Sequence, residues 1–497
     1  MAGQTTQQYI VLPARGLRAP QNRDAEVGMF LRTLNARIGV KASAKQVLPG
    51  VDVKVVDSIG EAGAKLIQIR PDALSDLRAS SPGVRIVPVR YYNLARAPIP
   101  RPLNKPKKLA TAVSVRIALK IVSASDGQPV RDALVVAFTD FESRDGLDGT
   151  TNAQGIVKFD FGTSSKKLER LYVYPSRGFY SFLKLNPTIV NGNTIKLTPI
   201  DLGFTAFPDV LRHFYPPSPL TAGTGITVGV VDTGTGPHPD LNVAGGLNCV
   251  EGENPTDFGD NGDMHGTHVG GIIAARGTSP TGVRGVAPGV TLRSYRVFPK
   301  GGQATNFAIA KAIDQAINDN CDLINLSLGE TGDDPAIHSA IVDARAKGTV
   351  VVGASGNEDR SPVDFPANDS LAIAVSAFGR KGTFPPSTAD AVEVQKPFGA
   401  DPKDFIAGFS NIGPEIDLTG PGVGIVSTVP GGFGVMSGTS MACPAVTGLI
   451  AKMIAANPAV LSMARDESRW DRIVQDALKA GKTLGFKPEF EGQGRLP

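Results

Sequence analysis

The sequence predicts an α/β fold, with a doubly wound and mostly parallel sheet, for the longest part of the chain. Five apolar runs from about residue 220 onward are nearly continuous, as expected of strands that are covered on both faces. Apolar residues recur at helical spacing over 308–317 and 446–454, which indicates connecting helices. Residues 200–497 are therefore expected to form one α/β domain. The runs are 226–232, 290–298, 321–328, 349–355 and 371–377.

A smaller α+β domain is predicted for residues 1–94. Short apolar stretches indicate strands, and helical patterns occur near 26–34 and 71–77. The stretches are QYIVLPA, VDVKVVDSIG, AKLIQIR and VRIVPVRYY. Residues 95–108 follow with four prolines and no acidic residue, and this composition predicts an extended linker of partly polyproline character.

An all-β sandwich is predicted for residues 109–199. Apolar residues alternate strictly from Val113 to Ile121, which is the pattern of a half-buried strand. Further short strands follow between turn sequences such as Asp126-Gly127, with no helical period among them. The sequence GQPVRDALV at 127–135, followed by TTNAQGIVKF, resembles the transthyretin-like modules fused to carboxypeptidases. A spacer that binds no ligand is the alternative interpretation.

Charge is divided unevenly along the chain. The net charge is +4, yet residues 1–108 carry 18 Lys and Arg against 7 Asp and Glu, so a basic head precedes an acidic body. The basic residues are scattered and few aromatic residues lie among them, which argues against a nucleic-acid partner. We expect instead that the head docks on its own body, as charge complementarity would favour.

Three other features bear on the compartment. No apolar run reaches the length of about 18 residues that suggests a membrane span. The first residues do not have the pattern of a signal peptide, which predicts a cytoplasmic protein, although a missing upstream leader would reverse that expectation. Three cysteines, Cys249, Cys321 and Cys443, are too few for a disulfide framework.

Reactive residue types occur where a parallel sheet would place a site, namely after the strands and in the turns that follow them. Asp232 ends an apolar run, His265 opens the segment HGTHVGGIIAA, and Ser440 lies in SGTSMACPAVTG. These three side chains could form an acyl-transfer relay. Asn357 follows another run in a Gly-Asn turn, where its amide could stabilise an oxyanion.

These motifs, in this order, resemble those of the subtilisin-like serine peptidases, or subtilases. The resemblance covers residues 205–490, and more weakly 8–94, which resemble the inhibitor-like propeptide of that family. It implies a serine endopeptidase with a catalytic triad, an acyl-enzyme intermediate and a zymogen form. Asn357 would supply the oxyanion hole. The residues implied for substrate binding are Ser327, Leu328, Gly329, Ala354, Ser355 and Gly356.

Several finer expectations follow from the same resemblance. The primary pocket would be roomy and uncharged, with tolerance for large apolar side chains before the cut bond. No cofactor is required for the chemistry; structural calcium is possible at Asp240, but the loop 275–285 offers no Asn or Asp side chain. Gly270 and Ala445 depart from the family pattern, and 379–407 is interpreted as an inserted surface loop.

Other reaction classes fit the sequence less well. An aspartic peptidase needs two D-T/S-G motifs, and only Asp232 begins one. The spacing of His265 and His268 lacks the glutamate of zinc peptidases, and G-T-S-M-A is not the motif of α/β-hydrolases. The residues interpreted as packing or surface residues are His213, His238, His268, His338 and Cys443.

Two questions stay open at this level. Maturation could cut in the linker 95–108 or near 200–220. The alternative function is a latent or inactive peptidase-fold protein that acts through binding by its β-sandwich.

Overall fold

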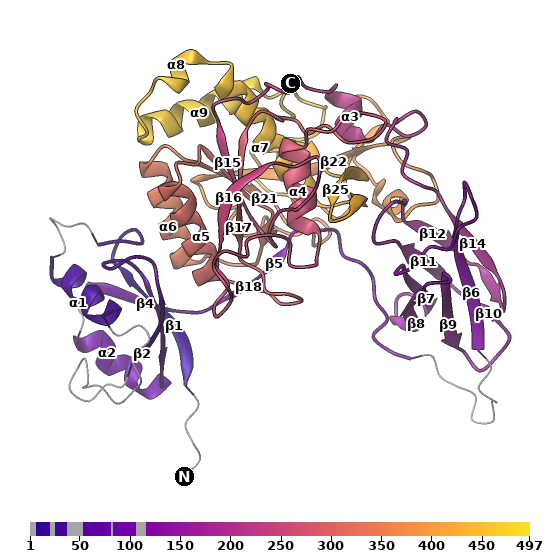
Figure 1. Ribbon diagram of the computed structural model, residues 1–497, viewed down its shortest axis with the longest axis horizontal. Coiled ribbons are helices and arrows are strands. Elements are labelled where there is room, and N and C mark those ends of the chain that lie inside the picture. The colour runs from indigo at the N-terminus through magenta and orange to yellow at the C-terminus, as the bar shows by residue number, and fades with distance from the viewer. Residues whose placement is uncertain (1–5, 20–24, 37–52, 81–82, 106–115) are drawn as a thin grey trace, which may run out of the picture.

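The computed structural model describes residues 6–19, 25–36, 53–80, 83–105 and 116–497 (Figure 1). An eight-stranded sheet forms the centre of residues 200–497, which we call the body from here on, in the order β16-β17-β15-β19-β21-β22-β23, with β24 also paired to β22. All of its pairings are parallel except that of β22 with β23. The doubly wound, mostly parallel sheet is thereby confirmed. Its strands are β15 (Thr227–Asp232), β16 (Val243–Asn248), β17 (Thr291–Arg296), β19 (Leu323–Leu326), β21 (Val350–Ala354), β22 (Ala372–Arg380), β23 (Asp404–Ile406) and β24 (Leu418–Pro421).

Helices cover both faces of this sheet, because successive residues of a strand point to opposite sides. Val230 packs in the cluster that contains α4 (His265–Ala274) and α7 (Thr439–Ala455). Val231 packs in the cluster that contains α5 (Asn306–Asn318) and α6 (Pro335–Ala346). The C-terminal part adds α8 (Pro458–Leu461), α9 (Glu467–Ala480) and α10 (Pro488–Glu491).

The N-terminal region folds as an antiparallel sheet in the order β2-β3-β1-β4. Its elements are β1 (Gln7–Pro13), α1 (Ala25–Asn35), β2 (Lys54–Ser58), β3 (Lys65–Ile69), the 3-10 turn Pro71–Ala73, α2 (Leu74–Ser80) and β4 (Val84–Pro88). The single strand predicted for VRIVPVRYY is divided: β4 stays in this sheet, while β5 (Tyr91–Leu94) pairs with the body. We call residues 6–90 the head.

Only strands occur among the described residues between 116 and 199. They are β6 (Arg116–Ser123), β7 (Leu134–Asp140), β8 (Asp145–Thr150), β9 (Ile156–Asp160), β10 (Ser165–Lys167), β11 (Arg170–Tyr174), β12 (Phe182–Leu185), β13 (Thr188–Val190) and β14 (Thr194–Leu197). The sheets β12-β11-β7-β8 and β14-β6-β9 enclose an apolar cluster that includes Ile117, Val135 and Val173. We call this region the sandwich. The predicted strand residues Val113 and Val115 lie outside the described residues.

The inserted segment 379–407 is exposed or half-buried over much of its length, as the sequence predicted, but part of it lies against the sandwich. Ala389, in its short 3-10 helix Ala389–Glu393, packs against the sandwich residues Val136 and Phe138. The amide of Leu183 donates to the carbonyl of Ser387 at 2.7 Å. The sandwich covers part of the insertion, a contact between distant parts of the chain that local composition does not reveal.

Hydropathy and thiol chemistry add two observations. None of the helices in the described residues is long and apolar enough to cross a membrane. All three cysteines are buried and free.

Candidate active site

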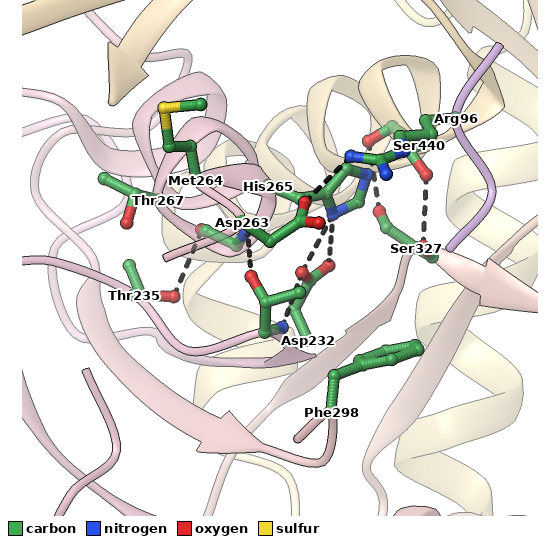
Figure 2. A network of polar contacts seen from close by, with 12 residues as sticks. Arg96, Asp232, Thr235, Asp263, Met264, His265, Thr267, Phe298, Ser327 and Ser440 are labelled. Carbon is green, nitrogen blue, oxygen red and sulfur yellow. Dashed lines mark hydrogen bonds and ion pairs between the residues drawn. The ribbon is translucent and has the colours of Figure 1, made fainter. Parts of the chain in front are cut away.

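Three secondary structure elements bring the predicted relay together. Asp232 is the last residue of β15, His265 is the first of α4, and Ser440 is the second of α7. Figure 2 shows the three side chains at one place in the body. Each is fully buried, so nothing from solvent reaches the hydroxyl of Ser440 in this conformation.

The Asp232 carboxylate holds the His265 ring. The ring Nδ1 lies 2.8 Å from Asp232 Oδ1 and 3.0 Å from Oδ2. Because a carboxylate can only accept, Nδ1 carries the proton and Nε2 is left free as a base. The amide of Thr233 also donates to Asp232 Oδ1, at 2.7 Å. The arrangement fixes both the tautomer and the orientation of the imidazole.

The third member of the relay is turned aside. The Ser440 hydroxyl donates to the carbonyl of Ser327 at 3.0 Å, whereas His265 Nε2 is buried without a hydrogen-bond partner. A rotation of the Ser440 side chain is therefore needed to join the hydroxyl to the imidazole.

Asn357 lies beside the start of α7. Its Oδ1 accepts from the amide of Thr439 at 2.8 Å, which fixes the direction of the side chain. Its Nδ2 is buried with no hydrogen-bond partner. The amide of Ser440, at the N-terminus of the same helix, donates at 2.9 Å to the carbonyl of Ala95, and the helix dipole favours negative charge there.

The chain itself occupies the cleft in front of these groups. β5 lies between β18 (Ala304–Thr305) and β20 (Leu328–Gly329), in a three-stranded antiparallel sheet. Tyr92 pairs with Ala304, and Leu94 pairs with Leu328. This is how an extended peptide adds a strand to an exposed edge. We call residues 91–97 the cleft segment.

The cleft segment continues past the nucleophile. Ala95 donates its amide to the carbonyl of Ser327 at 3.1 Å, and Ala97 donates to that of Ser437 at 2.9 Å. A Cβ atom on Gly438 would lie 2.8 Å from the Cα of Arg96. Gly438 is therefore required where peptide backbone crosses the start of α7. The Arg96 guanidinium pairs with Asp263 at 2.9 Å (Figure 2).

Comparison with known proteins agrees with this geometry. The model of the subtilase family matches residues 223–488, which is more than half of the chain. The chain belongs to the subtilase family. A thermostable alkaline protease of Halalkalibacterium halodurans is 40% identical over 230 residues, 46% of this chain and 56% of that protein. Subtilisin BL of Lederbergia lenta is 37% identical over 237 residues, 48% of this chain and 78% of that protein.

The matched part of this subtilase is limited to its body. Alkaline elastase YaB of a Bacillus strain is 38% identical over 238 residues, 48% of this chain and 56% of that protein. The chain thus spans little more than half the length of the first of these relatives. The departure at Gly270 has a local reason, because a Cβ atom there would lie 2.6 Å from Cγ2 of Thr235.

Acidic side chains lie against the residues predicted to line the substrate pocket. Leu328 and Gly329 form β20, and Ala354 ends β21 just before Ser355 and Gly356. A Cβ on Gly356 would lie 2.5 Å from Asp364 Oδ2 and 2.7 Å from Glu358 Oε2. Two carboxyl groups therefore adjoin this pocket. Asp364 is eight residues beyond Gly356 in sequence, and only the fold brings it there.

The other histidines have structural contacts. His268 is fully buried; its Nε2 donates to the carbonyl of Ile425 at 3.0 Å, and burial lowers its pKa to about 3, so it stays neutral. His238 donates to the carbonyl of Gly432 at 2.9 Å. His338 pairs with Asp369 at 2.6 Å, a partner that the sequence did not indicate. His213 stacks edge-to-face on the adjacent ring, Phe214.

Two further expectations concern Cys443 and calcium. Cys443 is fully buried, and desolvation raises its pKa, so it is a thiol. The carboxylate of Asp240 accepts from the amide of Val283 at 3.0 Å. Within the described residues, no three His, Cys, Asp or Glu side chains are grouped as metal ligands. The residues do not fit a carboxylate-rich calcium site, and no step below uses one.

The sequence indicated the relay and the pocket walls, but it missed three contributors to the cleft. These are the cleft segment, the strand edge at Ala304, and Asp364. The proline-rich stretch after Leu94 was the available signal for a segment that stays extended. No local signal pointed to Asp364.

Proposed function

We propose that this chain is a serine endopeptidase that acts through Asp232, His265 and Ser440. One observation carries the proposal: a peptide carbonyl, that of Ala95, is held by the amide of Ser440 while His265 Nε2 and Asn357 Nδ2 stay buried and unpaired. Buried polar atoms are nearly always hydrogen-bonded, so two such atoms in one site call for an explanation. A general base and an oxyanion donor are left unpaired until the reacting group reaches them.

The mechanism follows from these positions. Ser440 rotates toward His265, loses its proton to Nε2 and attacks the carbonyl carbon of the peptide bond. The Ser440 amide and Asn357 Nδ2 stabilise the oxyanion, and Asp232 stabilises the imidazolium. His265 then protonates the leaving amine. Water adds to the acyl-enzyme by the same route, which releases the acid and restores the hydroxyl.

We further propose that the chain is made as a zymogen and that its own bond between Ala95 and Arg96 is the one it cuts. The backbone of Ala95 is hydrogen-bonded on both sides of the cleft, to Ser327 and Ser440. This supports the linker, rather than 200–220, as the maturation site. The cut would leave the sandwich joined to the body and the head held only by contacts.

Labelling with a fluorophosphonate tests the proposal, with intact-mass analysis of the wild type and of Ser440→Ala. The expected result is labelling of the wild type alone and a new N-terminus at Arg96. Ser440→Ala should stay intact, with turnover lower by about six orders of magnitude. Equal labelling of both proteins would refute the assignment of the nucleophile.

The second candidate is a latent or inactive peptidase fold, and the hydrogen bond from the Ser440 hydroxyl to Ser327 favours it. The same experiment separates the two. If removal of the head by an added protease produces no labelling, the site is idle and the endopeptidase proposal is wrong.

A further inference from the structure

The cleft segment defines which pocket receives the side chain before the cut bond. The carbonyl of Ala95 accepts a hydrogen bond from the amide of Ser440, and the amide of Ala95 donates to the carbonyl of Ser327. Ala95 therefore occupies the position before the cut bond. Its methyl group belongs to the same buried cluster as Ala354 of the pocket wall. The walls run along 327–329 and 354–356. A methyl group is the smallest side chain that could enter between them.

Asp364 closes the far side of this pocket. Its amide donates to the carbonyl of Ser355 at 2.9 Å, and the next residue, Phe365, exchanges two backbone hydrogen bonds with Glu330, each of 3.0 Å. The stretch 364–365 thus joins the two walls. A Cβ on Gly329 would lie 3.0 Å from Cβ of Asp364 and 3.3 Å from its Oδ2. The absence of a side chain at both glycines lets this carboxyl group lie against the backbone of the two walls.

No cation balances this carboxyl group. The side chain of Asp364 is only 6% exposed, and its neighbours Glu358 and Glu330 are also acids. Glu358 Oε2 already accepts from the amide of Asn357 and from Asn411 Nδ2, each at 2.7 Å. Among the described residues, Asp364 has no ion pair with Lys, Arg or His. Burial, the two acids and a hydrogen bond with Glu358 raise its pKa to about 8, so near pH 7 this carboxyl group is largely protonated until a cation reaches it.

We propose that this pocket binds the cationic side chain of a lysine or arginine, and that these residues precede the bond that the enzyme cuts best. The inference rests on the proposed peptidase function and specifies its substrate class. A substrate cation favours the charged form of this acid and pairs with it through a charge-assisted hydrogen bond, which an apolar side chain cannot form. Ala95 does not supply the cation, so the enzyme's own bond is a poor substrate, and the cleft segment acts as a slowly cut inhibitor.

The test uses the matured enzyme and matched fluorogenic peptides that differ only in the residue before the bond: Arg, Lys, Leu or Phe. We expect kcat/KM at least tenfold higher for Arg and Lys than for Leu and Phe. Asp364→Asn should reduce the ratio of kcat/KM for the Arg peptide to kcat/KM for the Leu peptide at least tenfold. Asp359→Asn, at an exposed position of the same loop, is the matched control and should keep the preference.

The full chain provides a second test that does not depend on the folding of the Asp364 variant. Ala95→Arg should mature faster than Ala95→Leu, as followed by intact mass. Leu or Phe peptides cut as fast as Arg and Lys peptides, or equal maturation of both Ala95 variants, would overturn the inference. Fluorophosphonate labelling with any peptide cleavage would still support the peptidase function. Absence of both would refute that function itself.

Discussion

The head and the sandwich are both attached to the body, but by different kinds of contact. The head packs Ile10 and Leu12 into the cluster of α5 and α6, and ion pairs join Arg18 to Asp314 at 2.6 Å and Asp57 to Lys311 at 2.7 Å. It also delivers the cleft segment. In Figure 1 the head lies below α5 and α6, and the sandwich lies on the other side of the body.

The sandwich is joined through the insertion and through the body's own core. Ser181 Oγ accepts from the amide of Ala389 at 3.0 Å, and the amide of Gly178 donates to the carbonyl of Phe433 at 2.8 Å. Tyr180 is 2% exposed and belongs to the main cluster of the body. In the described residues, no ion pair joins the sandwich to the body.

The comparison distinguishes the head, whose covalent link the proposed cut would break, from the sandwich, which would stay covalently joined to the body. The head's contacts combine apolar packing and ion pairs with a bound peptide, and the proposed cut would break its covalent link. The sandwich's contacts combine hydrogen bonds with an aromatic side chain in the core of the body. The uneven division of charge that the sequence revealed bears only on the contacts between the head and the body.

The largest effect on this comparison is expected from Asn357→Ala. Loss of one oxyanion donor should slow both maturation and peptide turnover by about 10²–10³-fold, so the head would stay attached much as the sandwich does. In the structure Asn357 Nδ2 has no hydrogen-bond partner, so it is available to donate to the oxyanion. Stopped time courses with intact-mass analysis measure this, and an unchanged kcat would remove Asn357 from the mechanism.

Tyr180→Ala should show that the sandwich is part of the body's fold. Truncation of a buried aromatic side chain typically costs 3–5 kcal/mol, and here it also removes the edge-to-face contact with Phe207, whose centroid lies 6.2 Å away. Denaturant unfolding of the matured protein should register the loss in the main transition. Leu185→Ala, at a position that is 57% exposed, is the control. A loss confined to a separate sandwich transition would contradict the interpretation.

The insertion should make the sandwich side of the body sensitive to pH. Burial, with nearby Asp390, raises the pKa of Glu393 to about 7 from an ordinary value of 4.5. The folded state therefore holds this proton more tightly than the unfolded chain. Its contribution to stability is full below about pH 4.5 and is lost as the pH rises to about 7.

Glu393→Gln should accordingly flatten the dependence of the unfolding free energy on pH between 4.5 and 7. Denaturant melts at half-unit intervals measure the slope, with exposed Glu142→Gln as the matched variant. An unchanged slope in Glu393→Gln would show that the proton is held elsewhere.

Salt should have the smallest effect, and only on the head. Once the bond after Ala95 is cut, Arg18→Ala should weaken head binding about two- to fivefold at low salt, as for a partly exposed ion pair. At high salt the difference should shrink because the charges are screened. Titration of the isolated complex by size-exclusion chromatography measures it. A loss of affinity that is equal at both salt concentrations would point to packing rather than charge.

Much of the site could be predicted because its residues lie in unbroken local motifs. Asp232 and Asn357 follow apolar runs, and His265 and Ser440 lie in glycine-containing motifs at the start of apolar segments; parallel strands bring the turns that follow them together. The predicted strands and helices of the body are likewise present. The contact of the insertion with the sandwich and the place of Asp364 could not be predicted, because the residues that decide them lie far apart in sequence or in different layers.

By itself the sequence determined the fold class of the body, the reactive residues and the division of charge, since each is written in local pattern or composition. Tertiary structure alone decided that Ala95 lies at Ser440, that Asp364 closes the pocket and that the sandwich buries the insertion. Those facts depend on long-range packing: strand pairing across more than 200 residues and burial between layers. No window of the sequence contains both partners of such a contact.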